Sequence, residues 1–400
     1  MKFEKRKLKN GITVLFEKRD LPIVCYSVSN PFGGAHETSE IKGVAHLFEH
    51  LLFIGTTTRT HEDISREIEK RGGILNAFTA QDVTTYWCKL PSEHIDVAMD
   101  ILHDILKNPT FDAVKMEKEK KVVLEEIKMF HDDPERRVYE LIESALYHKP
   151  FGEGIIGSAE TVKSLSRDKI ISIFKENYAP EKYIVTVVGN VDIDKICLRL
   201  EKDFSPSGKI YVAVKPRKKN DNLIEERSGI QQAQLIWATH TELDEKTQYA
   251  LEILNIYLAN GMSSKLFLKI REELGLAYTV RGVIEKEKNY GYYSIYAGTT
   301  LESAEKVRDL IIQGIKDIEK MTEDDLVEAR ERLIGLRKVS TEESINTMQK
   351  LIFEEIGSGK AEGYYNFEKE LKKVRLLDIK ILAKNLVKAY STAMVLPKAE

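Results

Sequence analysis

The spacing of apolar and polar positions in the first half of the chain predicts strands and helices in mixed order. Alternation over residues 12–16 and 21–30 is typical of strands, and the turn-forming pair Asn10-Gly11 indicates that the first of them belongs to a hairpin. Further strands are predicted at about 74–80, 83–90 and 183–188, and helices at about 43–54, 60–70, 94–106, 113–130, 135–147 and 192–204. This mixture predicts an α+β fold.

The second half repeats part of this pattern. Residues 113–138 align with 323–348, and each segment reads as a charged amphipathic helix, a short acidic break and a further helix. We therefore expect a duplicated α+β unit, with domains at 1–204 and 223–400. The stretch 205–222 carries two prolines, a glycine and a short basic run, which favours a linker.

Composition narrows the class of protein. A chain of 400 residues is too long for a single hydrophobic core, so more than one domain is expected. A composition of 42% hydrophobic and 31% charged residues is typical of a soluble globular protein. Because 61 basic side chains face 64 acidic ones, we expect no nucleic-acid partner and no anionic membrane. No apolar run is long enough to span a bilayer, and residues 1–7 do not resemble a secretory signal. The three cysteines are far apart, which suits a reducing, cytoplasmic compartment.

The segment His46-Leu47-Phe48-Glu49-His50 carries the clearest chemistry. Residues four apart stack on one face of a helix, so both imidazoles can reach one ion, and Glu49 lies close enough to touch a water beside it. The neighbouring residues are apolar, and a buried His-Glu-His group is costly unless it is paired or holds a metal. The alternative is a satisfied pair of core histidines. Phosphate-binding glycine motifs and the G-x-S-x-G motif do not occur, so nucleotide binding and serine-hydrolase chemistry gain no support.

A catalytic zinc ion usually has three protein ligands and a water molecule, so a third ligand is needed. Glu119 and Glu126 are seven residues apart and fall on the apolar stripe of the predicted helix 113–130. Several other charged residues of this helix lie mostly off the stripe: Glu125, Lys118, Lys120, Lys121 and Lys128. Glu126 as ligand, with Glu119 behind it, is the economical assignment. The alternative is that both carboxylates pair with nearby basic side chains.

Several segments resemble the pitrilysin and mitochondrial-processing-peptidase family of inverted zincins. Residues 43–53 contain the H-x-x-E-H motif, and residues 119–127 place Glu126 at the separation that this family uses for its third ligand. Residues 73–79 resemble the strand edge that holds an extended substrate, and 261–278 resemble the companion motif of the second half. The similarity covers nearly the whole chain.

The resemblance implies a metal site in the first half. His46, His50 and Glu126 would bind one Zn2+ per chain, Glu49 would act as general base, and Glu119 would support the ligands. Leu336 stands where the repeat places the counterpart of Glu126, so only the first half is expected to bind metal.

The resemblance also implies substrate contacts. Asn76 and Ala77 would bind the substrate main chain, and Arg271 and Tyr278 would contact the substrate and the transition state. The residues alone favour the alternatives, in which Tyr278 is a core aromatic and Arg271 is a surface ion-pair partner.

These expectations define a function and its alternatives. The fold would consist of two homologous domains, each a mainly antiparallel sheet packed with helices, forming half of a clamshell. The function would be a zinc-dependent endopeptidase that hydrolyses peptides or unfolded segments in extended conformation. The alternatives are a catalytically silent binding or scaffold subunit and a zinc hydrolase of a non-peptide amide. The metal motif and Arg271 with Tyr278 lie in different halves of the chain, and the resemblance to relatives in which two such units are fused implies a homodimer with shared active sites. The alternatives are a monomer with an open cleft and a dimer whose sites are each complete within one chain.

Overall fold

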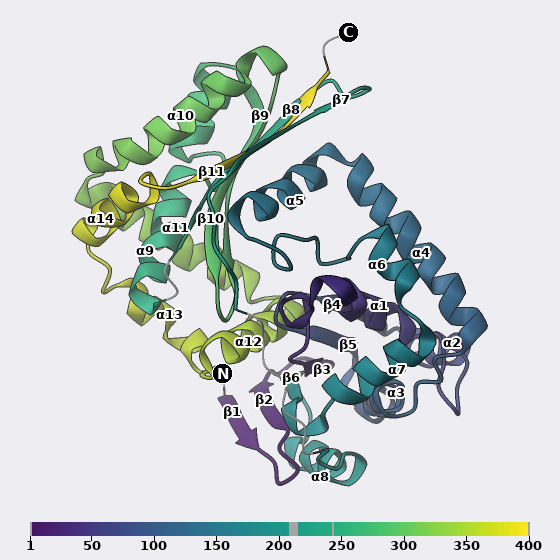
Figure 1. The fold of residues 1–400 in the computed structure, drawn as a ribbon. Coiled ribbons are helices and arrows are strands. Elements are labelled where there is room, and N and C mark those ends of the chain that lie inside the picture. The colour runs from purple at the N-terminus through teal and green to yellow at the C-terminus, as the bar shows by residue number, and fades with distance from the viewer. Residues whose placement is uncertain (1, 208–214, 242–243, 399–400) are drawn as a thin grey trace. The chain divides into compact units, whose positions relative to one another are not determined.

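The computed structural model describes residues 2–207, 215–241 and 244–398 (Figure 1). Contacts within the chain divide it into two compact units, each discontinuous in sequence. Unit 1 comprises Met1–Ile127, Gly154–Val214 and Ser340–Tyr364, and unit 2 comprises Lys128–Glu153, Lys215–Val339 and Tyr365–Glu400. The predicted linker 205–222 includes residues 208–214, which lie outside the described residues. The domain limits 1–204 and 223–400 stay a prediction.

Unit 1 contains a six-stranded sheet in the order β1-β2-β6-β3-β5-β4. Its strands are β1 Lys2–Lys7, β2 Thr13–Lys18, β3 Ile23–Asn30, β4 Ile74–Thr79, β5 Thr84–Pro91 and β6 Ile184–Gly189. Only β2 and β6 pair in parallel. The pairing of Lys7 with Thr13 confirms the predicted opening hairpin.

Unit 2 contains a five-stranded sheet in the order β7-β11-β8-β10-β9. Its strands are β7 Asn222–Arg227, β8 Ala233–His240, β9 Ala277–Lys286, β10 Gly291–Thr299 and β11 Ser391–Pro397. Here only β7 and β11 are parallel. Apart from β1, the two sheets have the same strand order and the same single parallel pair, as a duplicated unit requires. The predicted fold class is confirmed.

The helices that surround these sheets include every helix predicted in the first half. In chain order they are α1 Val44–Leu51, α2 His61–Glu69, α3 Ile95–Lys107, α4 Ala113–Asp132, α5 Pro134–Leu146, α6 Ala159–Ser164, α7 Arg167–Asn177, α8 Ile193–Asp203, α9 Glu245–Leu258, α10 Ala304–Lys316, α11 Glu323–Ser340, α12 Ser344–Ser358, α13 Gly363–Leu371 and α14 Leu376–Leu386. Helices α6 and α7 lie between the predicted helix 135–147 and the predicted strand 183–188, where no element is predicted.

Two equivalent helices pack on the sheet of the other half of the sequence. Helix α5 follows α4 in the first half of the chain but contacts β8 and β11 of unit 2. Helix α12 follows α11 in the second half but contacts β3 and β6 of unit 1. The sequence repeat aligned α4–α5 with α11–α12, so this exchange affects corresponding elements.

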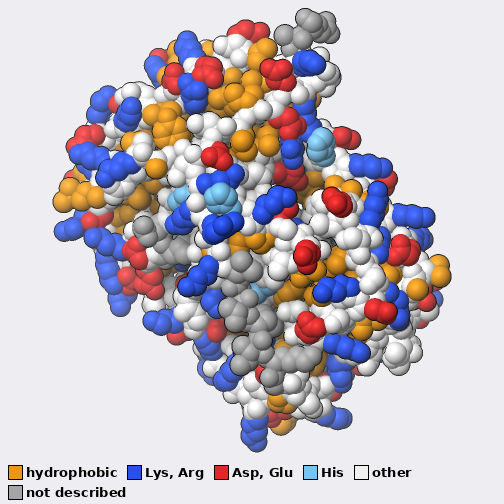
Figure 2. Space-filling model, viewed as in Figure 1, with side chains coloured by type: hydrophobic (Ala, Val, Ile, Leu, Met, Phe, Trp, Pro, Cys, Tyr) orange, Lys and Arg blue, Asp and Glu red, His pale blue; other side chains and the backbone are white. Residues whose placement is uncertain are grey.

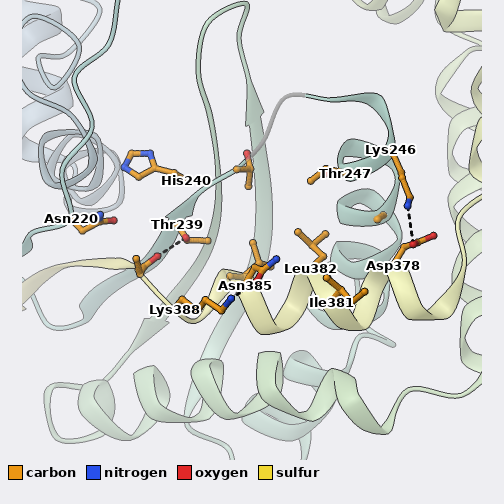
Figure 3. Close-up of a pocket in the computed structure, with 14 residues that line it drawn as sticks. Asn220, Thr239, His240, Lys246, Thr247, Asp378, Ile381, Leu382, Asn385 and Lys388 are labelled. Atoms are coloured by element: carbon orange, nitrogen blue, oxygen red, sulfur yellow. Dashed lines mark hydrogen bonds and ion pairs between the residues drawn. The ribbon is translucent and has the colours of Figure 1, made fainter.

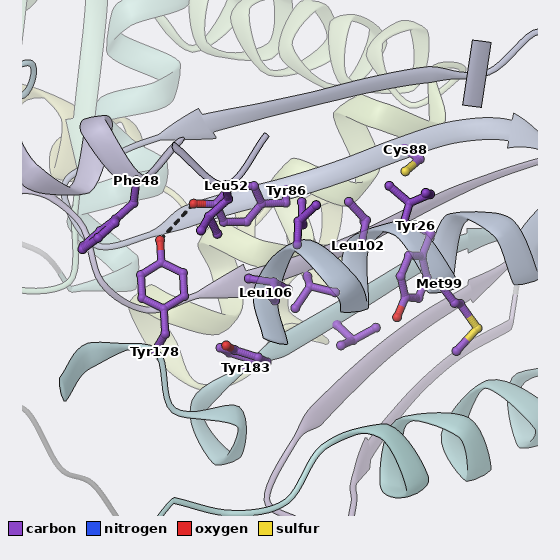
Figure 4. Packing of buried hydrophobic residues seen from close by; sticks show 14 of the residues in the cluster. Tyr26, Phe48, Leu52, Tyr86, Cys88, Met99, Leu102, Leu106, Tyr178 and Tyr183 are labelled. Carbon is purple, nitrogen blue, oxygen red and sulfur yellow. Dashed lines mark hydrogen bonds between the residues drawn. The ribbon is translucent and has the colours of Figure 1, made fainter. Parts of the chain in front are cut away.

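The core of unit 1 fixes one face of α1. Phe48 packs edge-on against Tyr178, with ring centroids 5.3 Å apart (Figure 4). It also packs edge-on against Phe174, with ring centroids 5.6 Å apart. The hydroxyls of Tyr178 and Tyr86 are 2.9 Å apart, which connects this cluster to β5. Since Phe48 faces the core, the helical period turns His46, Glu49 and His50 toward the opposite side.

Charges of both signs are interspersed on the surface. On the face shown in Figure 2, Lys and Arg side chains lie among Asp and Glu side chains across both units. This mixing agrees with the near-zero net charge of -3. Among the described residues, no helix combines the length and the hydrophobicity needed to cross a membrane.

Candidate metal centre

The two histidines of α1 and one glutamate of α4 converge in unit 1. The Nε2 atoms of His46 and His50 lie 3.6 and 3.5 Å from Oε2 of Glu126. One ligand atom from each of the three residues lies within 4.8 Å of the others. No other such group of three His, Cys, Asp or Glu side chains occurs among the described residues.

Glu119 lies beside His50, outside the cluster of three converging side chains. Its Oε2 is 3.6 Å from Nδ1 of His50, the ring nitrogen not directed at Glu126. A carboxylate in this position orients a ligating imidazole and increases its basicity. Glu119 and Glu126 are both half-buried, whereas Glu125 is exposed, in agreement with the predicted stripe.

One detail of that helix was predicted wrongly. Lys120 was expected to lie mostly off the buried stripe, but it is only 5% exposed. Its Nζ donates a hydrogen bond to the carbonyl of Leu165, 2.5 Å away, and pairs with Glu117 at 2.8 Å. A long lysine side chain can bury its stem when distant backbone supplies an acceptor, and helical spacing does not reveal such an acceptor.

Glu49 lies on α1 between the two histidines in sequence, and its carboxylate accepts a hydrogen bond from the sheet. The hydroxyl of Thr79, at the end of β4, donates to Oε2 of Glu49 at 2.6 Å. Burial raises the pKa of the Glu49 carboxyl, and the Thr79 hydrogen bond opposes this effect. Thr79 thus fixes one carboxylate oxygen, and Oε1 is not part of this bond.

The two histidines differ in their electrostatic surroundings. Burial lowers the pKa of His46 to about 4, although Glu126 opposes the shift, so this imidazole is neutral with a lone pair to share. Burial also lowers the pKa of His50, but Glu126, Glu49 and Glu119 together outweigh it and raise the pKa overall.

The donor set fits a zinc ion. Zinc is bound by imidazole nitrogen and carboxylate oxygen at about 2.0–2.2 Å in tetrahedral geometry, which separates two ligand atoms by about 3.3–3.5 Å. The separations of 3.5 and 3.6 Å between the imidazole nitrogens and Glu126 lie close to this value. Two nitrogen ligands and one oxygen ligand would leave one position for water or substrate.

The predicted substrate strand forms an edge of the sheet. β4 is the last strand in the sheet order of unit 1, so one side of it lacks a strand neighbour in that sheet. The N–H of Ala77 donates to Oδ1 of its neighbour Asn76 at 2.8 Å. The Ala77 N–H therefore donates to a side-chain oxygen here, and it could donate instead to a carbonyl of an added chain.

Arg271 and Tyr278 lie together in unit 2, whereas the other predicted site residues lie in unit 1. The Arg271 guanidinium lies 4.8 Å from the ring centroids of both Tyr278 and Phe267. Arg271 belongs to a π-helical segment, Phe267–Glu273, a geometry common at functional sites. Tyr278 is 73% exposed, so it is not a core aromatic.

Sequence reasoning missed the roles of Thr79 and Phe267. Thr79 ends the segment 73–79 that resembles the family's substrate strand, but only the fold brings it to Glu49. Phe267 lies four residues before Arg271, a spacing that places both side chains on one helical face and could have indicated the contact.

A cavity of about 470 Å³ lies in unit 2 between β8, α9 and α14 (Figure 3). Several of its polar side chains are partnered within the chain: Lys246 with Asp378, Lys388 with Asn385, and Thr239 with the carbonyl of Ala389. None of the predicted site residues lines it.

Comparisons with known proteins define the family. Residues 15–159 match the model described as Insulinase (Peptidase family M16), and residues 164–333 match that of the Peptidase M16 inactive domain. An uncharacterised zinc protease of Bacillus subtilis is 30% identical, with 97% of each chain covered. Another from Rickettsia felis is 33% identical over 83% of this chain and 82% of its own. The chain belongs to peptidase family M16, and the predicted resemblance is confirmed.

Solved structures show the same fold. A protease from Helicobacter pylori superimposes with a TM-score of 0.90 at 20% identity, covering 99% of both chains. A peptidase M16 inactive domain from Pseudomonas fluorescens has a TM-score of 0.89 at 17% identity, covering 100% of this chain and 99% of that one.

Proposed function

We propose that this chain is a zinc-dependent endopeptidase that hydrolyses peptides or unfolded segments. The observation that carries the proposal is the convergence of His46, His50 and Glu126, with the Glu49 carboxylate on the same helical face. The names of the zinc-protease relatives support the same assignment. One zinc ion per chain is expected, since the described residues contain one such cluster.

The residues divide the work between binding and proton transfer. His46, His50 and Glu126 would hold the zinc ion, which when bound supplies Lewis acidity toward the scissile carbonyl and an attacking water. Glu49, held at Oε2 by Thr79, would accept a proton from the attacking water at Oε1 and would pass it to the leaving amine. Glu119 keeps the ring of His50 oriented.

Substrate binding would occur by strand addition at β4. An extended peptide laid along this edge can form main-chain hydrogen bonds near Asn76 and Ala77, displacing the Asn76 side chain from the Ala77 N–H. Recognition of the main chain gives broad sequence specificity and requires an extended substrate. Unfolded peptides should therefore be cut, and compact folded proteins spared.

Three measurements on purified protein test this function. Metal analysis should find one zinc per chain, and digestion of a peptide mixture followed by mass spectrometry should show internal cleavages. Glu49→Gln should keep zinc but lose at least ~10²-fold in activity, the usual scale for a lost general base. Zinc binding without any cleavage by the wild-type chain would favour the alternative of a catalytically silent binding or scaffold subunit.

We further propose that the enzyme is a cytoplasmic homodimer. The metal cluster belongs to unit 1 and the Arg271–Tyr278 pair to unit 2. In a dimer, the Arg271–Tyr278 pair of one copy can therefore complete the metal site of the other copy. Cys25, Cys88 and Cys197 are buried free thiols, which suits a reducing compartment.

Mixing two inactive variants tests the shared site. If Glu49→Gln and Arg271→Ala/Tyr278→Phe chains exchange at random, about a quarter of wild-type activity should return under two-fold symmetry. Verified subunit exchange without recovered activity would show that each site is complete within one chain.

A further inference from the structure

A buried carboxylate outside α1 caps the start of this helix. Glu37 is fully buried, and its Oε2 and Oε1 accept hydrogen bonds from the N–H groups of Gly43 and Ala45 at 3.0 and 2.7 Å. Gly43 is the N-cap of α1 and has no side chain that could accept these bonds. Glu37 therefore satisfies donors at a helix end where most helices use their own cap residue.

Lys42 compensates the buried negative charge of Glu37. Its side chain is 1% exposed, and Nζ lies 3.6 Å from Oε2 of Glu37. The same Nζ donates to the carbonyl of Gly34 at 2.9 Å. A buried charge is retained only when it is paired and hydrogen-bonded. Both partners of the Lys42 ammonium, Glu37 and the carbonyl of Gly34, come from the segment that precedes α1.

The backbone next to Gly43 restricts the helix start from another side. Gly43 has φ +92°, and a Cβ placed there would lie 2.5 Å from the carbonyl oxygen of Ile156. A side chain cannot be accommodated at this position without moving the neighbouring loop. The direction in which α1 leaves its N-cap is thus set by the Glu37 cap and by this close approach.

This direction matters because α1 has only eight residues. We propose that Glu37, paired with Lys42, is a positioning residue that aims His46 and His50 at Glu126 and so preorganises the metal centre. The inference rests on the proposed function, because it requires that these three residues bind zinc. Glu37 acts on the imidazoles through the first turn of the helix, since Ala45 directly precedes His46.

The test compares zinc affinity with folding. Glu37→Gln keeps an oxygen for one N–H but places an amide NH2 near the other and leaves Lys42 unpaired. The double variant Glu37→Gln/Lys42→Met removes that unpaired charge and is expected to fold more stably than the single one. For both variants, the zinc dissociation constant is measured by chelator competition, and folding by circular dichroism and thermal unfolding of the metal-free protein.

We expect the double variant to be folded and to bind zinc about 10-fold more weakly, at the lower end of the loss seen when groups that support metal ligands are removed. The matched control is Glu40→Gln, an exposed acid in the same segment, which should bind zinc as the wild type does. A folded double variant with wild-type zinc affinity would overturn the positioning role alone. Failure of the wild type to bind zinc would overturn the proposed function as well, so the two failures are distinguishable.

Discussion

Replacing Thr79 by Val tests how the fold holds Glu49, the proposed general base. The change keeps the β-branched shape that suits the strand but removes the hydroxyl that donates to Oε2 of Glu49 at 2.6 Å. A hydrogen bond to a charged group contributes about 1.5–3 kcal/mol, and each 1.36 kcal/mol corresponds to tenfold in rate. If the bond is needed to aim the carboxylate, kcat/KM falls by about 10–100-fold. Water can replace part of the bond because Thr79 is only half-buried, so we expect a value near the lower limit.

The assay is steady-state cleavage of a fluorogenic peptide, combined with zinc titration of the same preparations. Thr79 is not among the converging ligands, so the zinc affinity of Thr79→Val should stay within about threefold of wild type. Thr79→Ser keeps the hydroxyl and should retain most of the activity. The reasoning would be refuted if Thr79→Val had wild-type kcat/KM, or if its loss of activity came entirely from lost zinc.

Two further predictions concern the metal and the acid stability. Glu126→Gln should bind zinc at least about 10-fold more weakly, whereas Glu125→Gln, altered at an exposed neighbouring position, should bind normally; the reverse order would show that the ligand assignment on α4 is wrong. His103 is buried between Tyr26 and Asp203, and burial lowers its pKa. Below about pH 6.5, His103 therefore binds a proton in the unfolded chain but stays neutral in the folded chain. Urea midpoints should therefore fall as the pH drops below about 6.5, and by less in His103→Gln; equal slopes for the two proteins would contradict this.

The sequence was sufficient where local rules decide the structure. The Asn10-Gly11 turn, the helix at 60–70 and the strands at 21–30 and 83–90 depend on neighbours within a few residues, and each was predicted near its observed position. The helical period also placed Glu119 and Glu126 on one face, and in the structure both carboxylates lie beside the ring of His50. Their roles as zinc-site residues stay proposals.

Contacts between segments distant in sequence could not be predicted. The acceptor of Lys120 is the carbonyl of Leu165 on another segment, and Glu49 accepts a hydrogen bond from Thr79 of the sheet. The cap at Glu37 lies six residues before Gly43, outside the range of ordinary capping motifs. In each case, the physical requirement is a partner for a buried polar group, and only the fold determines which distant residue supplies it.

The exchange of α5 and α12 leads to a last prediction, about the domain limits. In unit 1, Met348, Leu351 and Ile352 of α12 are fully buried in one cluster with Leu15 and other sheet residues. Full burial of such side chains contributes about 1.5–3 kcal/mol each, so the three together approach the whole stability of an ordinary domain, about 5–15 kcal/mol.

A chain cut to the predicted domain 1–204 lacks α12, so it exposes this apolar surface. It also leaves the buried guanidinium of Arg19 without the hydroxyl of Thr347, which lies 2.7 Å from Nη2 in the intact chain. We expect the fragment 1–204 to aggregate or to bind a hydrophobic dye, and to fold better when a peptide covering 340–364 is added. The matched control is a peptide in which Met348, Leu351 and Ile352 are replaced by Ser. A monomeric 1–204 fragment with a cooperative transition and no response to the peptide would show that α12 is dispensable, and that the sequence-based limits describe an independent domain.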